Sequence, residues 1–220
     1  MLENNLDAGR LQLIYDRTAA FYDEVVAEHQ AAAKEIALEL LDRRAGERFL
    51  ELAFGTGWAF ARVIETSGVE GAYGLDLAPG MVEVTRRRLS AESGMLPALL
   101  LGDCSRLPFA EGVFDCLLCT YTLECLPAGL ITATVQEMQR VLHRGGRAVI
   151  AGLTEGEGDD AAFTEEWKRG YTRDPEFFGG ARPLRLVRLL AAAGFEVNER
   201  AYSGHGAGWP SEVVRATKRW

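Results

Sequence analysis

The chain has 220 residues, of which 48% are hydrophobic and 25% are charged, values typical of one globular domain. Its 32 acidic and 24 basic residues give a net charge of −8, which argues against nucleic acid and against an anionic membrane surface as the main partner. The most apolar stretch, residues 113–135, contains charges and a proline, and the first residues lack the basic and apolar segments of a secretory signal. We therefore expect a single domain, residues 1–220, located in the cytoplasm and without an integral membrane segment.

The N-terminal residues, 1–45, are expected to form a helical cap. Residues 10–41 are rich in Ala and Leu, with acidic and basic residues between them, a pattern that predicts helix. We expect this helix to be broken near residues 18–23 and to end at Gly46.

From residue 48 onward, predicted strands alternate with predicted helices. Short apolar runs predict strands at residues 48–54, 71–75, 98–101, 114–119 and 147–151. Helices are expected at residues 58–64, 79–91 and 128–142. Because crossover connections between parallel strands are right-handed, this spacing predicts a parallel sheet with helices on both of its faces.

The C-terminal part departs from this alternation. Residues 153–183 carry glycines, acids and five aromatic residues, and a helix is predicted after them at residues 184–193. Two further strands are predicted at residues 196–202 and 211–217, joined by a loop too short for a crossover helix. The expected fold is therefore a doubly wound α/β sheet of seven strands, mostly parallel, with an antiparallel last strand.

The four cysteines lie in one short region of the sequence, at Cys104, Cys116, Cys119 and Cys125. Residues three apart on a strand point to opposite faces, so Cys116 and Cys119 are poorly placed to bind one metal ion, and no second Cys or His motif accompanies them. We expect reduced cysteines that belong to the core, and no metal site.

A glycine turn and two acids follow three successive predicted strands. Gly55-Thr56-Gly57 follows the first strand, Asp76 ends the second, and Asp103 ends the third. In a doubly wound sheet, ligands bind beyond the carboxyl ends of the strands, where a carboxylate can accept both hydroxyl protons of a ribose. Phe60 stands where the dinucleotide fingerprint requires its third glycine, and no Walker loop is present. The pattern therefore favours a nucleoside without a pyrophosphate.

Four ordered segments resemble the class I S-adenosylmethionine-dependent methyltransferases. They are residues 51–57 (ELAFGTG), 74–81 (GLDLAPGM), 102–109 (GDCSRLPF) with Phe114-Asp115, and 142–146 (LHRGG). Residues 15–23 (YDRTAAFYD) and the LPF segment are similar to the branch that includes the ubiquinone and menaquinone C-methyltransferases. The resemblance covers residues 15–217 except 153–183. It implies a Rossmann-like fold, S-adenosylmethionine as cofactor, and in-line methyl transfer to a small-molecule acceptor.

The resemblance also implies which residues hold each part of the cofactor. The methionine part would lie against Glu51 and the backbone of Ala53, Gly55 and Gly57, with Tyr15 or Tyr22 closing over its carboxylate. Asp76 would bind the ribose hydroxyls. Leu77, Asp103 and Cys104 would contact adenine, and Thr120 and Tyr121 would flank the sulfonium. The family usually has Gly-Cys or Gly-Thr where this chain has Ala53-Phe54, and we expect the added methyl group of Ala53 to leave cofactor binding intact.

Methyl transfer depends mainly on alignment of the reactants and exclusion of water, so a dedicated catalytic side chain is not required. If the acceptor must lose a proton, the candidate bases are Glu124, in the loop after the fourth strand, and His205, after the sixth. A helix-capping role is the alternative for Glu124, and the strand before His205 is expected at the far edge of the sheet. His29 and His143 are expected to be exposed surface residues.

Residues 153–183 are predicted to form a lid over the acceptor site. Their aromatic residues favour an apolar or ring-bearing acceptor, although Phe163, Trp167 and Tyr171 have the spacing of a helix that packs on the sheet. Between Glu155 and Glu166 there are six acids and no base, so we expect a neutral or cationic acceptor. The alternative to an enzyme is a non-catalytic binding module or partner subunit with this fold. Aminopropyl transfer from the same cofactor is disfavoured, because those enzymes resemble a different motif set.

Overall fold

The computed structural model describes residues 2–92 and 97–219, apart from the side chains of Glu92 and His205. Its seven-stranded sheet has the order β3-β2-β1-β4-β5-β7-β6. The strands are β1 (Phe49–Leu52), β2 (Ala72–Asp76), β3 (Ala98–Leu101), β4 (Phe114–Thr120), β5 (Leu142–Leu153), β6 (Phe195–Ser203) and β7 (Ser211–Lys218). Only β7 runs antiparallel to its neighbours, β5 and β6. The predicted mostly parallel sheet with an antiparallel last strand is confirmed, and β6 lies at the edge as expected.

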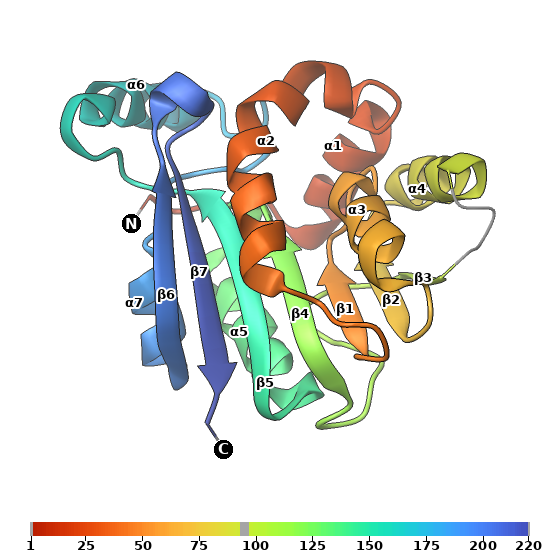
Figure 1. Cartoon of the computed structure of the whole chain (residues 1–220). Helices are drawn as coiled ribbons and strands as arrows, with labels where there is room; N and C mark the ends of the chain where they lie inside the picture. Colours follow the sequence, from red (N-terminus) through yellow and green to blue (C-terminus); the bar gives the residue numbers. More distant parts are fainter. Residues whose placement is uncertain (1, 93–96, 220) are drawn as a thin grey trace.

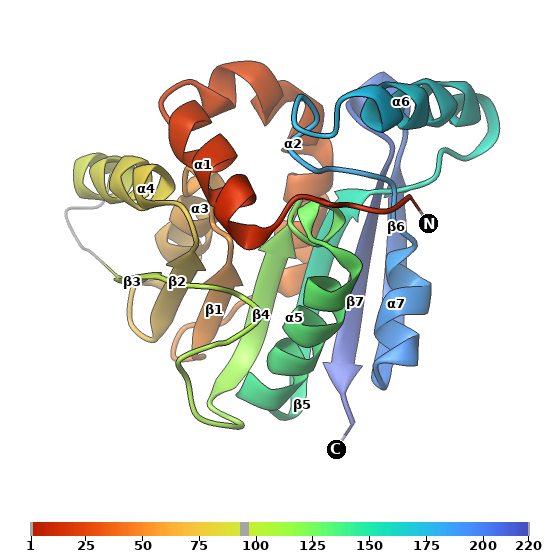
Figure 2. The same ribbon diagram turned by 180° about the vertical axis from the view of Figure 1, so that it is seen from behind.

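Helices cover both faces of the sheet (Figures 1 and 2). They are α1 (Ala8–Thr18), α2 (Tyr22–Leu41), α3 (Trp58–Ser67), α4 (Pro79–Glu92), α5 (Ala128–Val141), α6 (Ala161–Arg173) and α7 (Leu186–Ala192). Apolar side chains of α2, α3 and α4 pack in a core cluster on one face, and those of α5 and α7 pack in another on the opposite face. Helices α1 and α6 lie beyond the carboxyl ends of the parallel strands (Figure 1).

The N-terminal helical region is broken where the sequence predicts, because α1 ends at Thr18 and α2 begins at Tyr22. Helix α2 stops at Leu41, the last residue of the predicted helical stretch, and Asp42 rather than Gly46 terminates it, in a left-handed conformation with φ of 42°. The stop at Gly46 was wrong because Asp, like Asn, is among the few residues that enter this region at a helix end.

Strand β5 begins five residues before the predicted strand at 147–151. Leu142 pairs with Phe114, and Arg147 then pairs with Cys116, so the register shifts between the two pairs. Gly145, with φ of 82°, sits in this irregular part of the strand. The two glycines therefore mark a bulge inside a longer strand, where the sequence indicated a turn before a shorter one.

All four cysteines are buried and unpaired, which confirms their assignment to the core. None of the described helices is long and apolar enough to cross a membrane.

Candidate functional site

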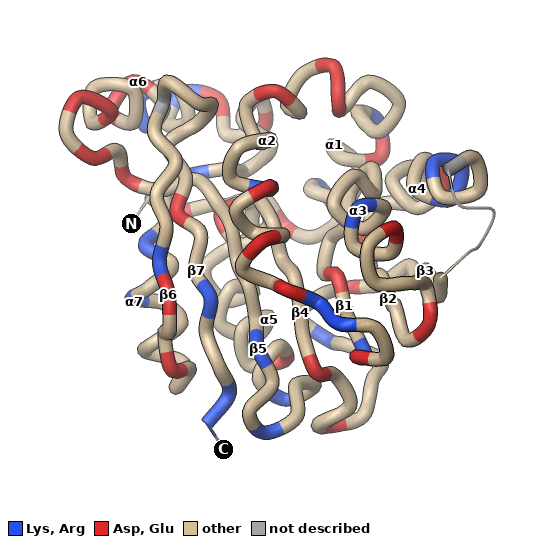
Figure 3. The backbone as a smooth tube through the Cα atoms, viewed as in Figure 1, with Lys and Arg blue, Asp and Glu red and all other residues tan. Residues whose placement is uncertain are grey.

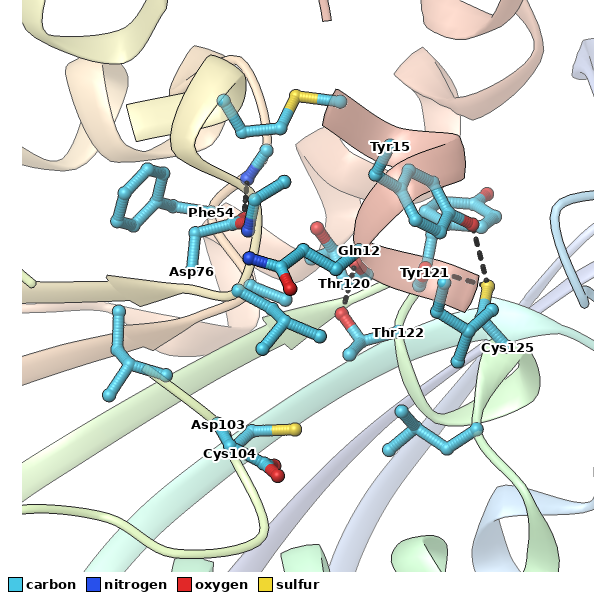
Figure 4. A pocket seen from close by; sticks show the side chains of 18 of the residues that line it. Gln12, Tyr15, Phe54, Asp76, Asp103, Cys104, Thr120, Tyr121, Thr122 and Cys125 are labelled. Atoms are coloured by element: carbon cyan, nitrogen blue, oxygen red, sulfur yellow. Dashed lines mark hydrogen bonds between the residues drawn. The ribbon is translucent and has the colours of Figure 1, made fainter. Parts of the chain in front are cut away.

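A pocket lies at the carboxyl ends of β1, β2, β3 and β4, under α1 and α2 (Figure 4). We call it the central pocket. It brings together ten of the residues that the sequence assigned to a cofactor: Tyr15, Tyr22, Ala53, Gly55, Asp76, Leu77, Asp103, Cys104, Thr120 and Tyr121. Gly57 and Glu51 do not line it. Gly57 is the N-cap of α3, and Glu51 is buried within β1.

The turn after β1 requires left-handed backbone at three positions. Gly55 and Gly57 have φ of 57° and 74°, and Ala53 has φ of 51°. A Cβ at Gly57 would lie 2.5 Å from Thr85 Cγ2, so only glycine lets the turn approach α4. For Ala53 the left-handed region costs about 1–2 kcal/mol. Compared with the glycine that the family usually has here, Ala53 therefore adds backbone strain as well as a methyl group.

The neighbouring Phe54 is accommodated by a glycine on β2. A Cβ at Gly74 would lie 2.7 Å from Cδ1 of the Phe54 ring. The ring meets Phe60 edge-on, with ring centroids 6.3 Å apart, a favourable arrangement for an aromatic pair. Phe54 thus packs in the core between the turn and α3.

Asp76 is held rigidly at the end of β2. Its Oδ2 accepts the N–H of Gly55 at 2.8 Å, and its Oδ1 accepts the N–H of Ala78 at 2.9 Å. Burial raises the pKa of Asp76 to about 6, against the lowering effect of these backbone donors. Each carboxylate oxygen keeps a further lone pair, so the side chain can still accept hydroxyl protons from a ligand.

The two ends of the central pocket are formed by different groups of residues. Figure 4 places the Asp103-Cys104 pair at one end, away from Tyr15 and Cys125 at the other. Asp103 Oδ1 accepts the N–H of Ser105 at 2.8 Å, which fixes the loop after β3. The Tyr15 hydroxyl lies 3.0 Å from the Gly179 carbonyl and 3.1 Å from Cys125 Sγ.

Sequence analysis missed Lys34, which lines the central pocket from α2. Burial lowers the pKa of Lys34 to about 8, and burial raises the pKa of Glu51 to about 8, while each charge opposes the shift of the other. Lys34 forms no ion pair with any described residue, and Glu51 Oε2 has no hydrogen-bond partner within the described ranges. The available signal was that Lys34 is the one basic residue in α2 other than His29 and stands next to the buried residues Ala33 and Ala37.

A second pocket, which we call the outer pocket, has a volume of about 330 Å³ and lies between α1, α2 and the 153–183 segment. It shares five lining residues with the central pocket: Tyr15, Tyr22, Gln30, Tyr121 and Cys125. The central pocket has a volume of only about 100 Å³. The two pockets are therefore contiguous, and the larger space lies on the side of the segment that the family motifs do not cover.

Tyr121 stands between the two pockets in a strained conformation. Its φ is 53°, a left-handed value that is rare for a bulky residue and typical of functional sites. Its N–H donates to the Ala151 carbonyl at 2.7 Å, and its hydroxyl lies 2.7 Å from Ser211 Oγ. Strand β5 therefore fixes the backbone of Tyr121, and β7 fixes its hydroxyl.

Of the two candidate bases, Glu124 lies in a short 3-10 helix, Leu123–Cys125, and lines the outer pocket. It is 1% exposed, and its Oε1 accepts the N–H of Leu153 at 2.9 Å. The alternative of a helix-capping acid is wrong, because this bond reaches across to β5. Burial raises the pKa of Glu124 to about 7. The side chain of His205 lies outside the described residues, so its role stays a prediction.

The aromatic residues of the 153–183 segment divide between two roles. Trp167 lines the outer pocket, and its Nε1 donates to the Ala181 carbonyl at 2.9 Å. Tyr171 is buried instead, with its hydroxyl donating to the Glu3 carbonyl at 3.1 Å. Trp167 is thus placed to contact an acceptor, whereas Tyr171 packs against the N-terminal segment.

The acids of this segment are mostly paired, as the basic residues interleaved around α6 in Figure 3 suggest. Glu155 and Glu165 pair with Lys168 at 2.6 and 3.0 Å. Further pairs join Glu166 to Arg169, Glu157 to Arg200 and Glu176 to Arg10. The negative charge of this segment is therefore smaller than the sequence count indicated, because basic side chains from α6 and β6 form ion pairs with its acids.

Two histidines were expected on the surface. His143 meets Asp115 at the opposite, amino edge of the sheet, with Nε2 3.0 Å from Oδ1. His29 is exposed, but its ring stacks on Trp209 with centroids 5.3 Å apart, a contact that the sequence did not indicate.

Comparisons with known proteins agree with this geometry. A family model described as a methyltransferase domain matches residues 49–146. The demethylmenaquinone methyltransferase of Beutenbergia cavernae is 38% identical over 114 residues, which cover 52% of this chain and 44% of that protein. The malonyl-[acyl-carrier protein] O-methyltransferase of Herminiimonas arsenicoxydans is 30% identical over 194 residues, which cover 87% of this chain and 68% of that protein.

Solved structures of low sequence identity share the fold. The magnesium protoporphyrin IX methyltransferase of Synechocystis PCC 6803 is 14% identical, with a TM-score of 0.74 and coverage of 96% of this chain and 100% of that chain. The chain spans about half the length, or less, of several curated relatives that it matches. On its sequence relatives and its Rossmann-like fold, the chain belongs to the class I S-adenosylmethionine-dependent methyltransferases.

Proposed function

We propose that this protein transfers the methyl group of S-adenosylmethionine to a small-molecule acceptor. The observation that carries the proposal is the composition of the central pocket. It combines a fixed carboxylate, Asp76, with the partly buried ammonium of Lys34, while Glu51, whose Oε2 has no hydrogen-bond partner among the described residues, lies buried within β1 outside the lining. An adenosyl amino acid offers a ribose diol to Asp76 and a carboxylate to Lys34. The residues present therefore fit the cofactor of the family.

The chain's residues would hold the cofactor in three parts. Asp76 accepts from the ribose hydroxyls, while Leu77, Asp103 and Cys104 form the adenine end. Lys34 would bind the carboxylate of the methionine part, with the Tyr15 or Tyr22 hydroxyl over it, and Glu51 would act on the ammonium from within β1, outside the lining. The cofactor supplies a methyl group activated by a positively charged sulfur. Thr120 and Tyr121 border the space where that group would lie.

We place the acceptor in the outer pocket, where residues 1–45 act as a cap and residues 153–183 as a lid. The contiguity of the two pockets through Tyr121 and Cys125 supports this placement. Aromatic and apolar side chains dominate the lining, which suits a partly apolar acceptor and excludes water from the reacting atoms. Alignment and dehydration are the protein's main contributions to this reaction.

Transfer of labelled methyl groups to a panel of amines, phenols, hydroquinones and carboxylic acids tests the proposal. We expect turnover of at least one class, and we expect Asp76→Asn to reduce it at least tenfold because a charged hydrogen bond to the ribose is lost. Asp159→Asn, an exposed acid of the same type, serves as the matched control and should retain the wild-type rate. Binding of the cofactor without turnover on any class would favour the non-catalytic module instead.

A further inference from the structure

We propose that the outer pocket binds a small amine with an apolar ring, and that Glu124 pairs with its nitrogen and removes a proton from it. This inference rests on the proposed function, since the nitrogen would be the atom that receives the methyl group. It assigns a substrate class to the outer pocket and a catalytic role to one oxygen of one carboxylate.

The first observation is the incomplete bonding of the Glu124 carboxylate. Oε1 accepts from Leu153 N, but Oε2 is fully buried and has no partner among the described residues. A buried carboxylate oxygen without a partner costs free energy, which a ligand donor can recover. Gly152 leaves room beside it, because a Cβ there would lie 2.8 Å from Oε2. The local packing thus leaves space for the Glu124 carboxylate, of which only one oxygen has a hydrogen-bond partner among the described residues.

The second observation is the charge around the outer pocket. Neither Lys nor Arg is among the residues that line it. Buried Arg182 approaches Glu124 only at the main chain, where its guanidinium donates to the Glu124 carbonyl at 2.8 Å, and it also donates to the Leu2 carbonyl. The other lining acid, Glu176, is already paired with Arg10. Arg182 lies outside the lining and lowers the pKa of Glu124 electrostatically, but it makes no ion pair with the carboxylate. Among the residues that line the outer pocket, Glu124 is therefore the one acid without an ion pair, which favours a cationic ligand over a neutral or anionic one.

The third observation is the aromatic wall. Trp167 meets Phe178 and Trp209 with ring centroids 4.9 and 5.1 Å away, and Trp209 meets Tyr121 at 6.2 Å. All four residues line the outer pocket. Aromatic rings attract ammonium groups through their faces and pack against the ring of a ligand. A cavity of about 330 Å³ is at the small end of the range for ligand sites, which suits a compact amine.

Proton transfer follows from the same arrangement. The ammonium nitrogen gives one N–H proton to Glu124 Oε2, which frees its lone pair. That lone pair forms the new N–C bond as the C–S bond breaks, and the electron pair of the broken bond stays on sulfur. The methylated nitrogen keeps one positive charge, and the sulfur becomes a neutral thioether. Because burial raises the pKa of Glu124 to about 7, its carboxylate is a stronger base than an exposed one.

The test compares ligands that share a carbon skeleton and differ in charge, by calorimetry with S-adenosylhomocysteine present. The probes are 2-phenylethylamine and tryptamine, the corresponding alcohols, and 3-phenylpropanoate. We expect the wild type to bind each amine at least tenfold more tightly than its alcohol, and the acid weakest. Equal or tighter binding of the alcohols, or preferential binding of the acid, would overturn the proposal. This ligand series needs no variant, so it decides even if a variant does not fold.

The substitution Glu124→Gln then tests whether Glu124 causes the tighter binding of amines. It should abolish the amine preference and leave binding of the alcohols unchanged, whereas Glu166→Gln, an exposed acid of α6 outside the pocket, should keep the preference. Retention of the amine preference in Glu124→Gln would contradict the pairing. Binding of S-adenosylhomocysteine alone separates the two claims. If the wild type binds it but shows no amine preference, only this inference fails, and if it does not bind at all, the proposed function fails.

Discussion

Ala53 occupies a left-handed backbone position that favours glycine, immediately before the turn that borders the central pocket. We predict that Ala53→Gly stabilises the protein by about 1 kcal/mol, because relief of the left-handed conformation exceeds the added flexibility of the unfolded chain. Urea unfolding measures this change. Ala133→Gly, in the regular helix α5, is the control and should destabilise by about 1 kcal/mol. Equal destabilisation by both substitutions would mean that Ala53 carries no strain.

Lys34 lines the central pocket, although no sequence motif pointed to it. We predict that Lys34→Met weakens binding of S-adenosylhomocysteine at least tenfold, because the methionine carboxylate loses its charged partner. Binding of 5′-methylthioadenosine, which has no amino-acid part, should not change. Calorimetry with both ligands gives the comparison. A loss of the same size for both ligands, as Asp76→Ala should produce, would show that Lys34 acts on the pocket as a whole.

At the scale of the element, α1 closes the central pocket. Leu11, Gln12 and Tyr15 line it, and the remaining volume of about 100 Å³ is well below the 300 Å³ or more of typical ligand sites. We therefore expect helix α1 to move outward when a nucleoside binds. Its polar contacts with the rest of the chain include the Arg10–Glu176 ion pair, the Tyr15 hydroxyl bond to Gly179 and the bond from the Gly80 N–H to Asp16, and Leu11 packs in the core.

This arrangement predicts the exchange behaviour of α1. Without ligand, its amide hydrogens should exchange faster than those of α5, which packs in the core. Saturating S-adenosylhomocysteine should slow exchange in α1 by at least tenfold and leave α5 unchanged, as measured by hydrogen–deuterium exchange with mass spectrometry. If α1 exchanges at the same rate with and without ligand, it is not the element that closes the pocket.

For the molecule as a whole, the buried acids make stability depend on pH. Burial raises the pKa of Glu51, Asp76 and Glu124 to about 8, 6 and 7. Each folded-state pKa lies above the unfolded value near 4, so the stabilising contribution is complete below about pH 4 and is lost as the pH rises toward 8. Lys34 shifts downward and adds an opposite trend only above about pH 8.

We therefore predict that the melting temperature of the ligand-free protein falls between pH 5 and pH 8. Glu124→Gln should show a smaller fall, because the amide does not titrate and can still accept from Leu153. Thermal unfolding at several pH values measures both slopes, with Glu166→Gln as the exposed control. Identical slopes for the wild type and Glu124→Gln would contradict the burial of a titrating carboxyl at this position.

The sheet is well predicted because the sequence patterns that indicate its strands are local. The apolar runs, the glycine turn and the position of Asp76 each depend on neighbours along the chain, and the strand order then follows from known handedness. The end of α2 and the start of β5 were misjudged because Asp42 and the bulge near Gly145 depend on finer backbone conformations.

The functional site was only partly predictable, because its remaining features arise between segments distant in sequence. Lys34 faces Glu51 across the packing of α2 on the sheet, and Trp167 reaches Trp209 only after α6 folds over β7. Likewise, Arg200 on β6 neutralises Glu157, which the charge count treated as free. Such contacts leave no periodic pattern in the sequence.

The most direct test of the whole account is the binding of S-adenosylhomocysteine to the purified protein, measured by calorimetry. We predict one site per chain, weakened at least tenfold by Asp76→Ala and unaffected by Asp159→Ala. Absence of binding to the wild type at about 1 mM ligand, a concentration that detects even weak complexes, would contradict the central claim.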